Sequence, residues 1–388
     1  MEHLAPSPGD LRTEGDPPAD RMVIELLDSG EIAHANQVLH GLRHNDQLVP
    51  EDLPAVLRDY LMETRPVPAW VDSERIARVH AFFRHDGIHV ASALSLGAMV
   101  GCYAAPMGAK LLHTTHRLDH PHRRLSETTQ FLLHMMAEDP LGRHGDLVPA
   151  IQKVRLIHAA VRQLLLRDGH WDVAEHGVPI CQEDLLGATL IFSVTVLQGM
   201  ARMGVHCTPQ EAEDYYYTWR VVGVMLGLRA DAVPESLAEA EQLWKEMEPR
   251  HLGPSAEGIA LTGGLLDLYH QIAPPGVRGA VPAVVRRMVG SQVADWMEVP
   301  AGRWEKVVAG AAHAEESVNA VEEHHVLARR VLDRVGRILL NAEVRRVTHG
   351  QSTEFDIPSE LSAGDAPQVP AARAGDAGCC PQDARPAP

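Results

Sequence analysis

Between residues 21 and 350, apolar side chains recur at helical spacing almost throughout, and this pattern is the strongest constraint on the fold. Strand signals are scarce: aromatic residues make up only 4% of the chain, and no alternating run of Val, Ile and Thr is closed by an Asn-Gly turn. Helix starts are frequent, and one of them, Thr208 to Glu211, is a capping box with Pro209 at the first helical position. The sequence therefore predicts an all-α protein.

The chain has 388 residues, 45% hydrophobic and 22% charged, which is a globular composition long enough for one large domain. Residues 1–20 and 351–388 differ, because both are rich in Pro, Gly and Asp and neither has an apolar period. We therefore expect one large helical domain over residues 21–350. A disordered N-terminal segment and a disordered C-terminal tail should flank it, and their removal should change stability little.

Net charge and the N-terminal sequence limit the partners and the location. A charge of −17 argues against nucleic acid, because phosphate binding needs clustered Lys and Arg. The N-terminus lacks the basic and apolar regions of a secretory signal, so the cytoplasm is the expected location. Val90–Ala109 and Leu185–Ala201 are strongly apolar, but the first contains Pro106 and the second is short for a span of roughly 20 residues. Buried core helices are expected there, with no stable membrane span.

The segment from Val148 to Arg167, VPAIQKVRLIHAAVRQLLLR, is the most informative one for chemistry. On a helix, one apolar stripe about 80° wide contains Ile151, Val154, His158, Val161 and Leu165. Two arginines, at positions 155 and 162, fall about 60° and 40° from the histidine. Guanidiniums beside an apolar stripe are unfavourable unless an anion meets them.

Two arrangements satisfy this helix. A haem would give iron to the imidazole of His158 and two propionates to Arg155 and Arg162. Alternatively, the histidine is an ordinary hydrogen-bonded core residue, and the arginines pair with Asp or Glu from another helix. The helix alone leaves both arrangements open.

Other metal patterns are weaker. Glu-x-x-His, which can build a di-iron carboxylate site on a helical bundle, occurs about as often as chance predicts, at Glu31/His34, Glu248/His251 and Glu322/His325. A histidine cluster with no recognised zinc spacing comprises His113, His116, His120 and His122. Three cysteines, Cys102, Cys181 and Cys207, are typical of reduced and mostly buried thiols, and the Cys379–Cys380 pair in the tail has no zinc spacing either.

The sequence RLIHAAVR at residues 155–162 is similar to the Arg-x-x-His-x-x-x-Arg signature of the catalytic domain shared by latex-clearing proteins and the mycophenolate-pathway oxygenase MpaB. About thirty residues upstream, RLSET at 124–128 resembles the distal-side segment of that family. Two downstream blocks, at 177–184 and 217–223, resemble further blocks of the family. The four blocks lie in order within roughly residues 70–230, so together they are far more specific than any one alone.

The resemblance implies a haem b protein with a globin-like helical core and additional helices. It makes His158 the proximal iron ligand, which Arg155 and Arg162 accompany in the signature, and it places Arg124 and Thr128 on the distal side. Latex-clearing proteins have a distal lysine that can approach the iron, whereas this sequence has Glu127 at that position. That difference argues against rubber cleavage, as does the missing export signal.

The distal segment also makes sense from its own residues. On a helix, Arg124, Thr128, Phe131 and Met135 share one face, and Glu127 lies about 60° to one side. Such a face suits an oxygen-binding pocket for a hydrophobic substrate. The alternative is a surface cluster of the three polar residues with the two large apolar ones in the core.

These observations predict a haem b-dependent oxygenase. O2 would be activated at iron held by His158, and the substrate would be a small hydrophobic, unsaturated, isoprenoid-like molecule. Arg124, Glu127 and Thr128 would form the polar part of the pocket, with Glu127 as a candidate acid or base. An electron donor is a further candidate partner. The alternatives are a haem-binding sensor or carrier without turnover, and a non-haem di-iron oxidase.

Overall fold

The computed structural model of the chain describes residues 11–50, 53–114, 121–169, 171–273, 278–313 and 356–358, and only the backbone for 121–126, 272 and 311–313. Throughout these ranges the regular structure is helical, and the described residues include no β-strand. The all-α prediction is therefore confirmed.

The N-terminal half contains α2 (Pro17–Ser29), α3 (Ile32–Gly41), α4 (Ala55–Glu63), α5 (Ser73–Ser92), the π-helical segment η1 (Ala93–Ala98), α6 (Met99–Tyr103), α7 (Pro106–Thr114), α8 (Pro121–Met135) and α9 (Leu147–Asp168). The remainder contains α10 (Val173–His176), α11 (Gln182–Leu190), the π-helical segment η2 (Ile191–Thr195), α12 (Val196–Arg202), α13 (Pro209–Met225), the 3₁₀ turn η3 (Ala230–Ala232), α14 (Leu237–His251), α15 (Ala256–Ile272), α16 (Ala280–Val289), α17 (Ser291–Trp296) and α18 (Trp304–His313).

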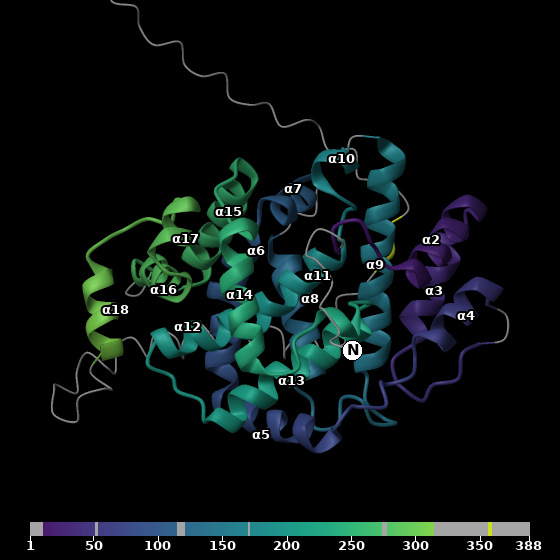
Figure 1. The fold of residues 1–388 in the computed structure, drawn as a ribbon, viewed down its shortest axis with the longest axis horizontal. Coiled ribbons are helices and arrows are strands. Elements are labelled where there is room, and N and C mark those ends of the chain that lie inside the picture. The colour runs from purple at the N-terminus through teal and green to yellow at the C-terminus, as the bar shows by residue number, and fades with distance from the viewer. Residues whose placement is uncertain are drawn as a thin grey trace, which may run out of the picture.

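The helices form three groups in space (Figure 1). On one side, α2, α3 and α4 lie against α9, and α2 makes the most extensive contact with it. On the opposite side, α16 packs with α17 and α18. Between them, α5 packs along α13, and the continuous run of α11, η2 and α12 passes through the middle. The middle group and α9 together enclose the site described below.

Helix α9 is the wall shared by the α2–α4 group and the middle group. Its first turn contains Pro149, a position at which the backbone N–H has no hydrogen-bond partner within the helix, so proline costs no hydrogen bond. The helix is capped at its C-terminal end by Gly169 in the left-handed conformation, with φ of 73°. One face, with Leu156, Ala159 and Ala160, packs into the small core of α2–α4. A second face carries Ile157 and Val161 towards Trp171. The helix is therefore held from both sides, and Ile157 and Val161 also belong to the stripe that faces the cavity described below.

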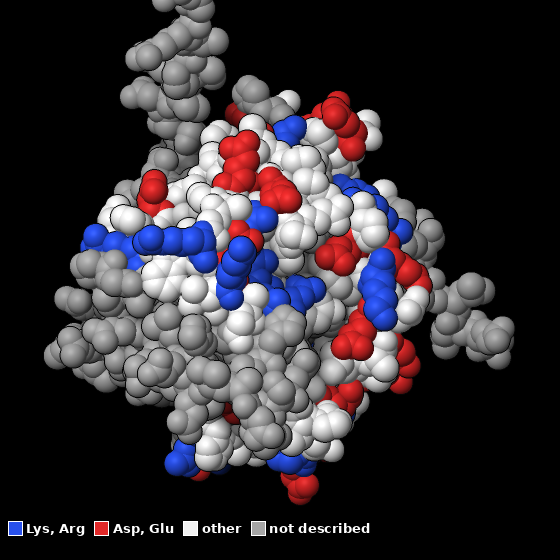
Figure 2. Space-filling model, turned by 90° about the vertical axis from the view of Figure 1, so that its left-hand side faces the viewer, with Lys and Arg blue, Asp and Glu red and all other residues white. Residues whose placement is uncertain are grey.

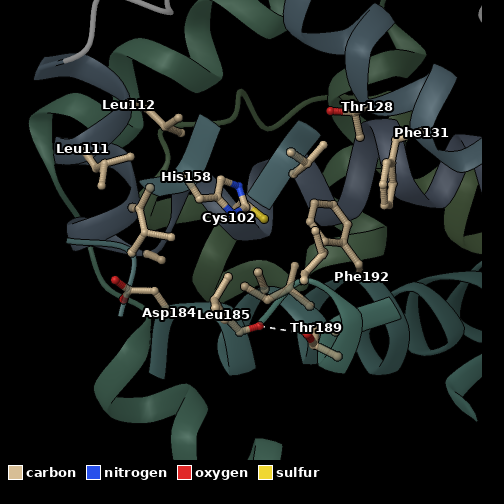
Figure 3. A pocket seen from close by; sticks show the side chains of 18 of the residues that line it. Cys102, Leu111, Leu112, Thr128, Phe131, His158, Asp184, Leu185, Thr189 and Phe192 are labelled. Atoms are coloured by element: carbon tan, nitrogen blue, oxygen red, sulfur yellow. Dashed lines mark hydrogen bonds between the residues drawn. The ribbon is translucent and has the colours of Figure 1, made fainter. Parts of the chain in front are cut away.

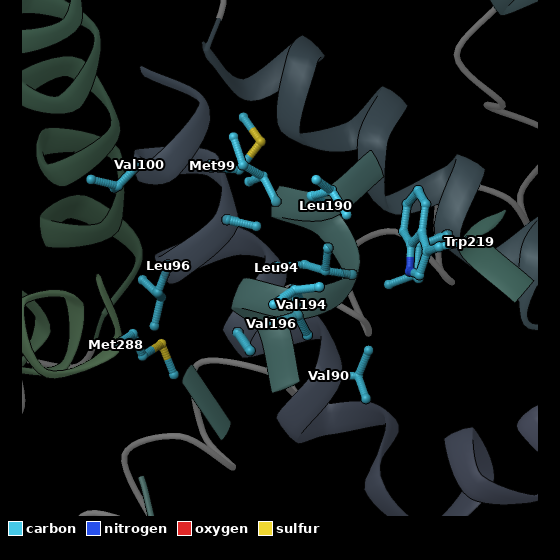
Figure 4. Packing of buried hydrophobic residues seen from close by; sticks show 14 of the residues in the cluster. Val90, Leu94, Leu96, Met99, Val100, Leu190, Val194, Val196, Trp219 and Met288 are labelled. Atoms are coloured by element: carbon cyan, nitrogen blue, oxygen red, sulfur yellow. The ribbon is translucent and has the colours of Figure 1, made fainter. Parts of the chain in front are cut away.

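Two π-helical segments lie next to each other in the main core. In η1 and η2 the backbone is wound with an extra residue per turn, a feature often found near functional sites. Leu94 and Leu96 of η1 pack in the same apolar cluster as Val194 of η2, with Met288 of α16 on the far side (Figure 4). Hydroxyls accompany the windings: Ser193 donates to Thr189 O at 2.6 Å, and Thr195 donates to Ile191 O at 2.7 Å.

Both ends of the chain are ordered further than the sequence predicted. Leu11 is 3% exposed and Asp16 is 2% exposed, so the prediction of disorder up to residue 20 is wrong for residues 11–20. At the other end, Ile357 is buried in the core of α2–α4, and its backbone exchanges two hydrogen bonds with the Asn36 side chain, at 2.8 and 3.0 Å. The prediction of a disordered tail from 351 is therefore wrong for residues 356–358. Neither segment has a repeating apolar pattern that would predict its packing on the helical core, because single residues make the contacts.

The two apolar segments expected as core helices are helical in the structure. Among the described residues, Gln182–Arg202 is long and apolar enough to cross a membrane, and Ser73–Tyr103 with Pro106–Thr114 meets the same criterion as a pair bent by 91°. Most of the first helix is buried inside the fold, and burial accounts for its apolar composition.

Charged side chains of both signs appear on the face shown in Figure 2. Lys and Arg side chains of the described residues lie there near Asp and Glu side chains, although the chain carries a net charge of −17. The net negative charge of the chain therefore does not make this face uniformly acidic.

Candidate active site

A cavity of about 330 Å³ lies at the centre of the fold. Its walls come from η1, α6, α7, α8, α9, α11, η2 and α13, and the end of α14 contributes one part. Most lining side chains are apolar, among them Leu94, Leu112, Phe131 and Phe192. A cavity of this size with a few polar groups is typical of a small-molecule site.

His158 of α9 points into this cavity (Figure 3). Val154 and Val161, one turn before it and one turn after it, line the same wall, as helical spacing indicates. The Nδ1 atom of the imidazole is buried, and Cys102 lines the same cavity. The sequence therefore identified the one histidine that α9 presents to the cavity.

Arg155 and Arg162 lie outside the cavity lining and meet acids of the N-terminal segment. Arg155 forms a two-pronged ion pair with Asp16, in which Nη2 lies 2.7 Å from Oδ1. This is the arrangement with acids from another helix that the sequence left open. Burial lowers the pKa of Arg155 and the pairing with Asp16 outweighs it, so the pKa is raised overall and the guanidinium stays charged.

Arg162 is only 1% exposed, and all of its hydrogen bonds are made within the protein. It pairs with Asp20 of α2 and donates to the carbonyls of Pro179 and Ile180 at 2.9 and 2.8 Å. The role of the two arginines towards haem propionates stays a prediction, since both guanidiniums already have carboxylate partners here.

The predicted distal segment forms α8, and it contributes Glu127, Thr128 and Phe131 to the cavity. Met135, expected on the same face, is instead buried in the main core. The helix is long enough that its last turn passes beyond the cavity. Arg124 lies in the first turns of α8, and its side chain is outside the described residues.

Sequence reasoning missed two titratable residues of the cavity, Asp184 and His251. Asp184 is in the third position of α11, where its carboxylate accepts the N–H of Cys181 at 3.2 Å in a capping box. Its position alone therefore suggests only a helix cap. His251 is the last residue of α14, and the sequence singled it out only as part of the pair Glu248/His251. No local signal joins the two, because they meet through the packing of α11 on α14.

The other metal patterns do not assemble in the described part of the chain. Among the described residues, no three His, Cys, Asp or Glu side chains come together as a metal site. The pair Glu322/His325 lies outside the described residues, as do His116, His120 and the Cys379–Cys380 pair, and the same holds for the side chain of His122. Burial raises the pKa of the Cys181 and Cys207 thiols to about 12, which agrees with inert, reduced cysteines.

The described residues form an all-helical fold in which a histidine faces a mostly apolar cavity, and comparison with known proteins identifies the class of this protein. The model of the family described as "ER-bound oxygenase mpaB/B'/Rubber oxygenase, catalytic domain" matches residues 82–355. The chain therefore belongs to this family of oxygenase catalytic domains and is an enzyme of the oxygenase class. The resemblance seen in the sequence blocks is confirmed.

Individual relatives agree with the family. The chain is 28% identical over 282 residues to a rubber oxygenase of Streptomyces sp. (strain K30), which covers 72% of this chain and 69% of that protein. A solved structure of a latex clearing protein in the closed state superimposes with a TM-score of 0.76, at 24% identity, over 87% of this chain and 92% of that one. This likeness shows that the two proteins share a fold.

Proposed function

We propose that the protein is a haem b-dependent oxygenase that uses O2 to oxidise or cleave a small hydrophobic, unsaturated, isoprenoid-like substrate. The observation that carries the proposal is His158, an imidazole that projects from a rigid helix into an apolar cavity which Glu127 and Thr128 also line. Membership of the oxygenase family supports the reaction class. The rubber oxygenase relative supports an isoprenoid-like substrate.

The side chains around His158 suit a haem in their chemistry. An imidazole is a usual protein ligand of haem iron, and the surrounding walls offer apolar contact for a porphyrin. Small residues at Ala105, Gly108 and Ala188 keep parts of the lining free of bulk. In this proposal His158 would be the iron ligand, and Val154, Ile157 and Val161 of the same helix would pack against the ring.

When bound, the haem would supply the iron at which O2 is activated. The protein's own residues would do the rest. Phe131, Phe192 and Trp219 would exclude water and hold the hydrocarbon part of the substrate. Glu127 would hold or deliver a proton at its carboxylate, and Thr128 would offer a hydroxyl next to it. Both come from α8, whose preceding turn carries Arg124.

A visible absorption spectrum of the purified protein tests the cofactor, and product analysis under air with an isoprenoid alkene tests turnover. We expect a haem spectrum with an imidazole-ligated iron, and oxidised or cleaved product. His158→Ala should purify folded by circular dichroism but with little haem, because the protein bond to iron is gone.

The matched control is His80→Ala. His80 lies on α5, where its Nδ1 is 2.8 Å from Met136 O, and it does not line the cavity. This variant should keep its haem content. A wild-type protein that binds no haem even when haem is added, or a His158→Ala variant with the wild-type spectrum, would overturn the proposal. A haem spectrum without turnover of any alkene would favour the sensor or carrier alternative.

A further inference from the structure

The cavity has a second polar region, formed by α11 and α14 and separate from the His158 helix. Its members are Asp184 and His251, and both line the cavity. Around them the wall is apolar, with Ile180, Leu185 and Ala188. Neither residue has a part in the function proposed above.

The two side chains are brought together by a glycine. Gly187 lies three residues after Asp184, so the two positions are neighbours on one face of α11. The imidazole of His251 rests on Gly187: a Cβ placed there would lie 2.4 Å from Nε2. Any larger residue would displace the ring, so Gly187 provides the room in which His251 reaches the cavity next to Asp184.

The charge state of the pair follows from its surroundings. Burial lowers the pKa of His251, and the nearby Arg12 and Arg250 add to this, while the carboxylate of Asp184 opposes it. The ring is therefore neutral near neutral pH, with one nitrogen that donates a hydrogen bond and one that accepts. Asp184 accepts. The region thus offers one donor and at least one acceptor.

We propose that Asp184 and His251 bind the hydroxyl group of a hydrophobic substrate, so that the enzyme takes an isoprenoid-like alcohol in preference to a hydrocarbon. A hydroxyl donates one hydrogen bond and accepts another, which matches a carboxylate beside a neutral imidazole. A pure hydrocarbon would offer neither group a hydrogen bond, so it would bind less tightly than the alcohol. The inference rests on the proposed function only in taking this cavity as the substrate site.

Binding measurements with matched ligands test the inference without requiring turnover. The dissociation constants of geraniol and of geraniol methyl ether, which has the same chain but no O–H donor, are measured by calorimetry on the protein as purified. The wild type should bind the alcohol about tenfold more tightly, as one hydrogen bond to a charged group predicts. In Asp184→Asn and in His251→Leu the alcohol and the ether should bind with about equal affinity.

Two further variants make the test sharper. Gly187→Ala removes neither polar group but displaces the imidazole, so it should also reduce the preference. Thr189→Val is the matched control: Thr189 lines the same cavity, but its hydroxyl already donates to Leu185 O at 2.8 Å. It should keep the full preference.

Equal wild-type affinity for the alcohol and the ether, no binding of either, or an unchanged preference in both Asp184→Asn and His251→Leu would overturn the inference. Should any variant fail to fold, the wild-type comparison of the two ligands still decides. The outcome is also separate from the function proposed above. Turnover of alkenes without a preference for the alcohol would contradict only this inference. A clear preference for the alcohol in a protein that binds no haem would contradict only the proposed function.

Discussion

Asp16 and Arg155 connect the first turn of α2 to the helix that carries His158. Asp16 caps α2 with its side chain, accepting from Ala19 N, and the same carboxylate pairs with Arg155, three residues before the histidine. The family model begins at residue 82, so α2 precedes the matched domain while its acids meet both arginines of the family signature. The N-terminal segment is thus part of the support of the site.

Breaking this connection should destabilise the protein strongly. Asp16→Ala leaves the Arg155 guanidinium charged and largely buried, and loss of one partner from a buried ion pair costs about 3–5 kcal/mol. Urea unfolding followed by circular dichroism measures the change. The control is Arg21→Ala, whose exposed pair with Glu63 should contribute at most about 1 kcal/mol. Equal effects of the two substitutions would contradict the structural role of Asp16.

Local periodicity predicted the residues that share one helix face and could not predict the partners from elsewhere in the chain. Val154, His158 and Val161 line one wall because a helix places them there, and the sequence showed this. The partners of the two arginines lie 139 and 142 residues away along the chain, in a segment too short and too polar to show an apolar period. Their pairing depends on the docking of α2 on α9, which no local pattern encodes.

The same distinction applies to the second polar region of the cavity. Asp184 was inside a family-like block, yet its capping position gave a complete structural explanation. His251 lies 67 residues after Asp184 in the chain. Its imidazole reaches the cavity only because residue 187 is a glycine. Space left by a glycine on a distant helix is a property of the packed fold.

Glu127→Gln tests the acid-base role on the distal side. The amide keeps the shape of the side chain but carries no acidic proton, so turnover should fall by roughly 10²–10⁴-fold while haem content is retained. Rates under air and the visible spectrum give the two readouts. Glu138→Gln, an exposed position just after α8, should leave the rate unchanged. A Glu127→Gln enzyme as fast as the wild type would remove this carboxylate from the reaction.

Acid should weaken the fold through His251. Its pKa in the folded protein is lowered, so below about pH 6.5 the unfolded chain takes up a proton that the folded protein resists. The free energy of unfolding therefore falls as the pH drops from about 6.5 towards the lowered pKa. Melting temperatures of the wild type and His251→Leu between pH 8 and pH 5 test this, and the wild type should lose more over the interval. Parallel curves would show that the imidazole is not a source of acid sensitivity.

The docked part of the C-terminal tail should matter to stability, and the residues after it should not. Ile357 is 2% exposed in the core of α2–α4, so Ile357→Ala should lower the free energy of unfolding by about 2–5 kcal/mol. Removal of residues 359–388, which have no apolar period, should leave the melting temperature unchanged. The two variants are compared by thermal unfolding, and a truncation as harmful as the substitution would move the boundary of the folded domain further along the chain.

Because η1 and η2 are π-helical, the shape of the cavity wall depends on the number of residues in these two segments. Each successive residue of an α-helix turns the next side chain by about 100°, and each π segment accommodates its extra residue within one widened turn. Deleting one residue within 93–98 or 191–195 would let the segment return to ordinary α-helix. The widened turn already absorbs the extra residue, so the helices on either side would keep their orientation, while side chains inside the segment, such as Leu94 or Phe192, would take new directions around the helix axis and leave the cavity wall. Substrate fit in this enzyme can therefore change through single-residue insertions and deletions at these two places, without any substitution.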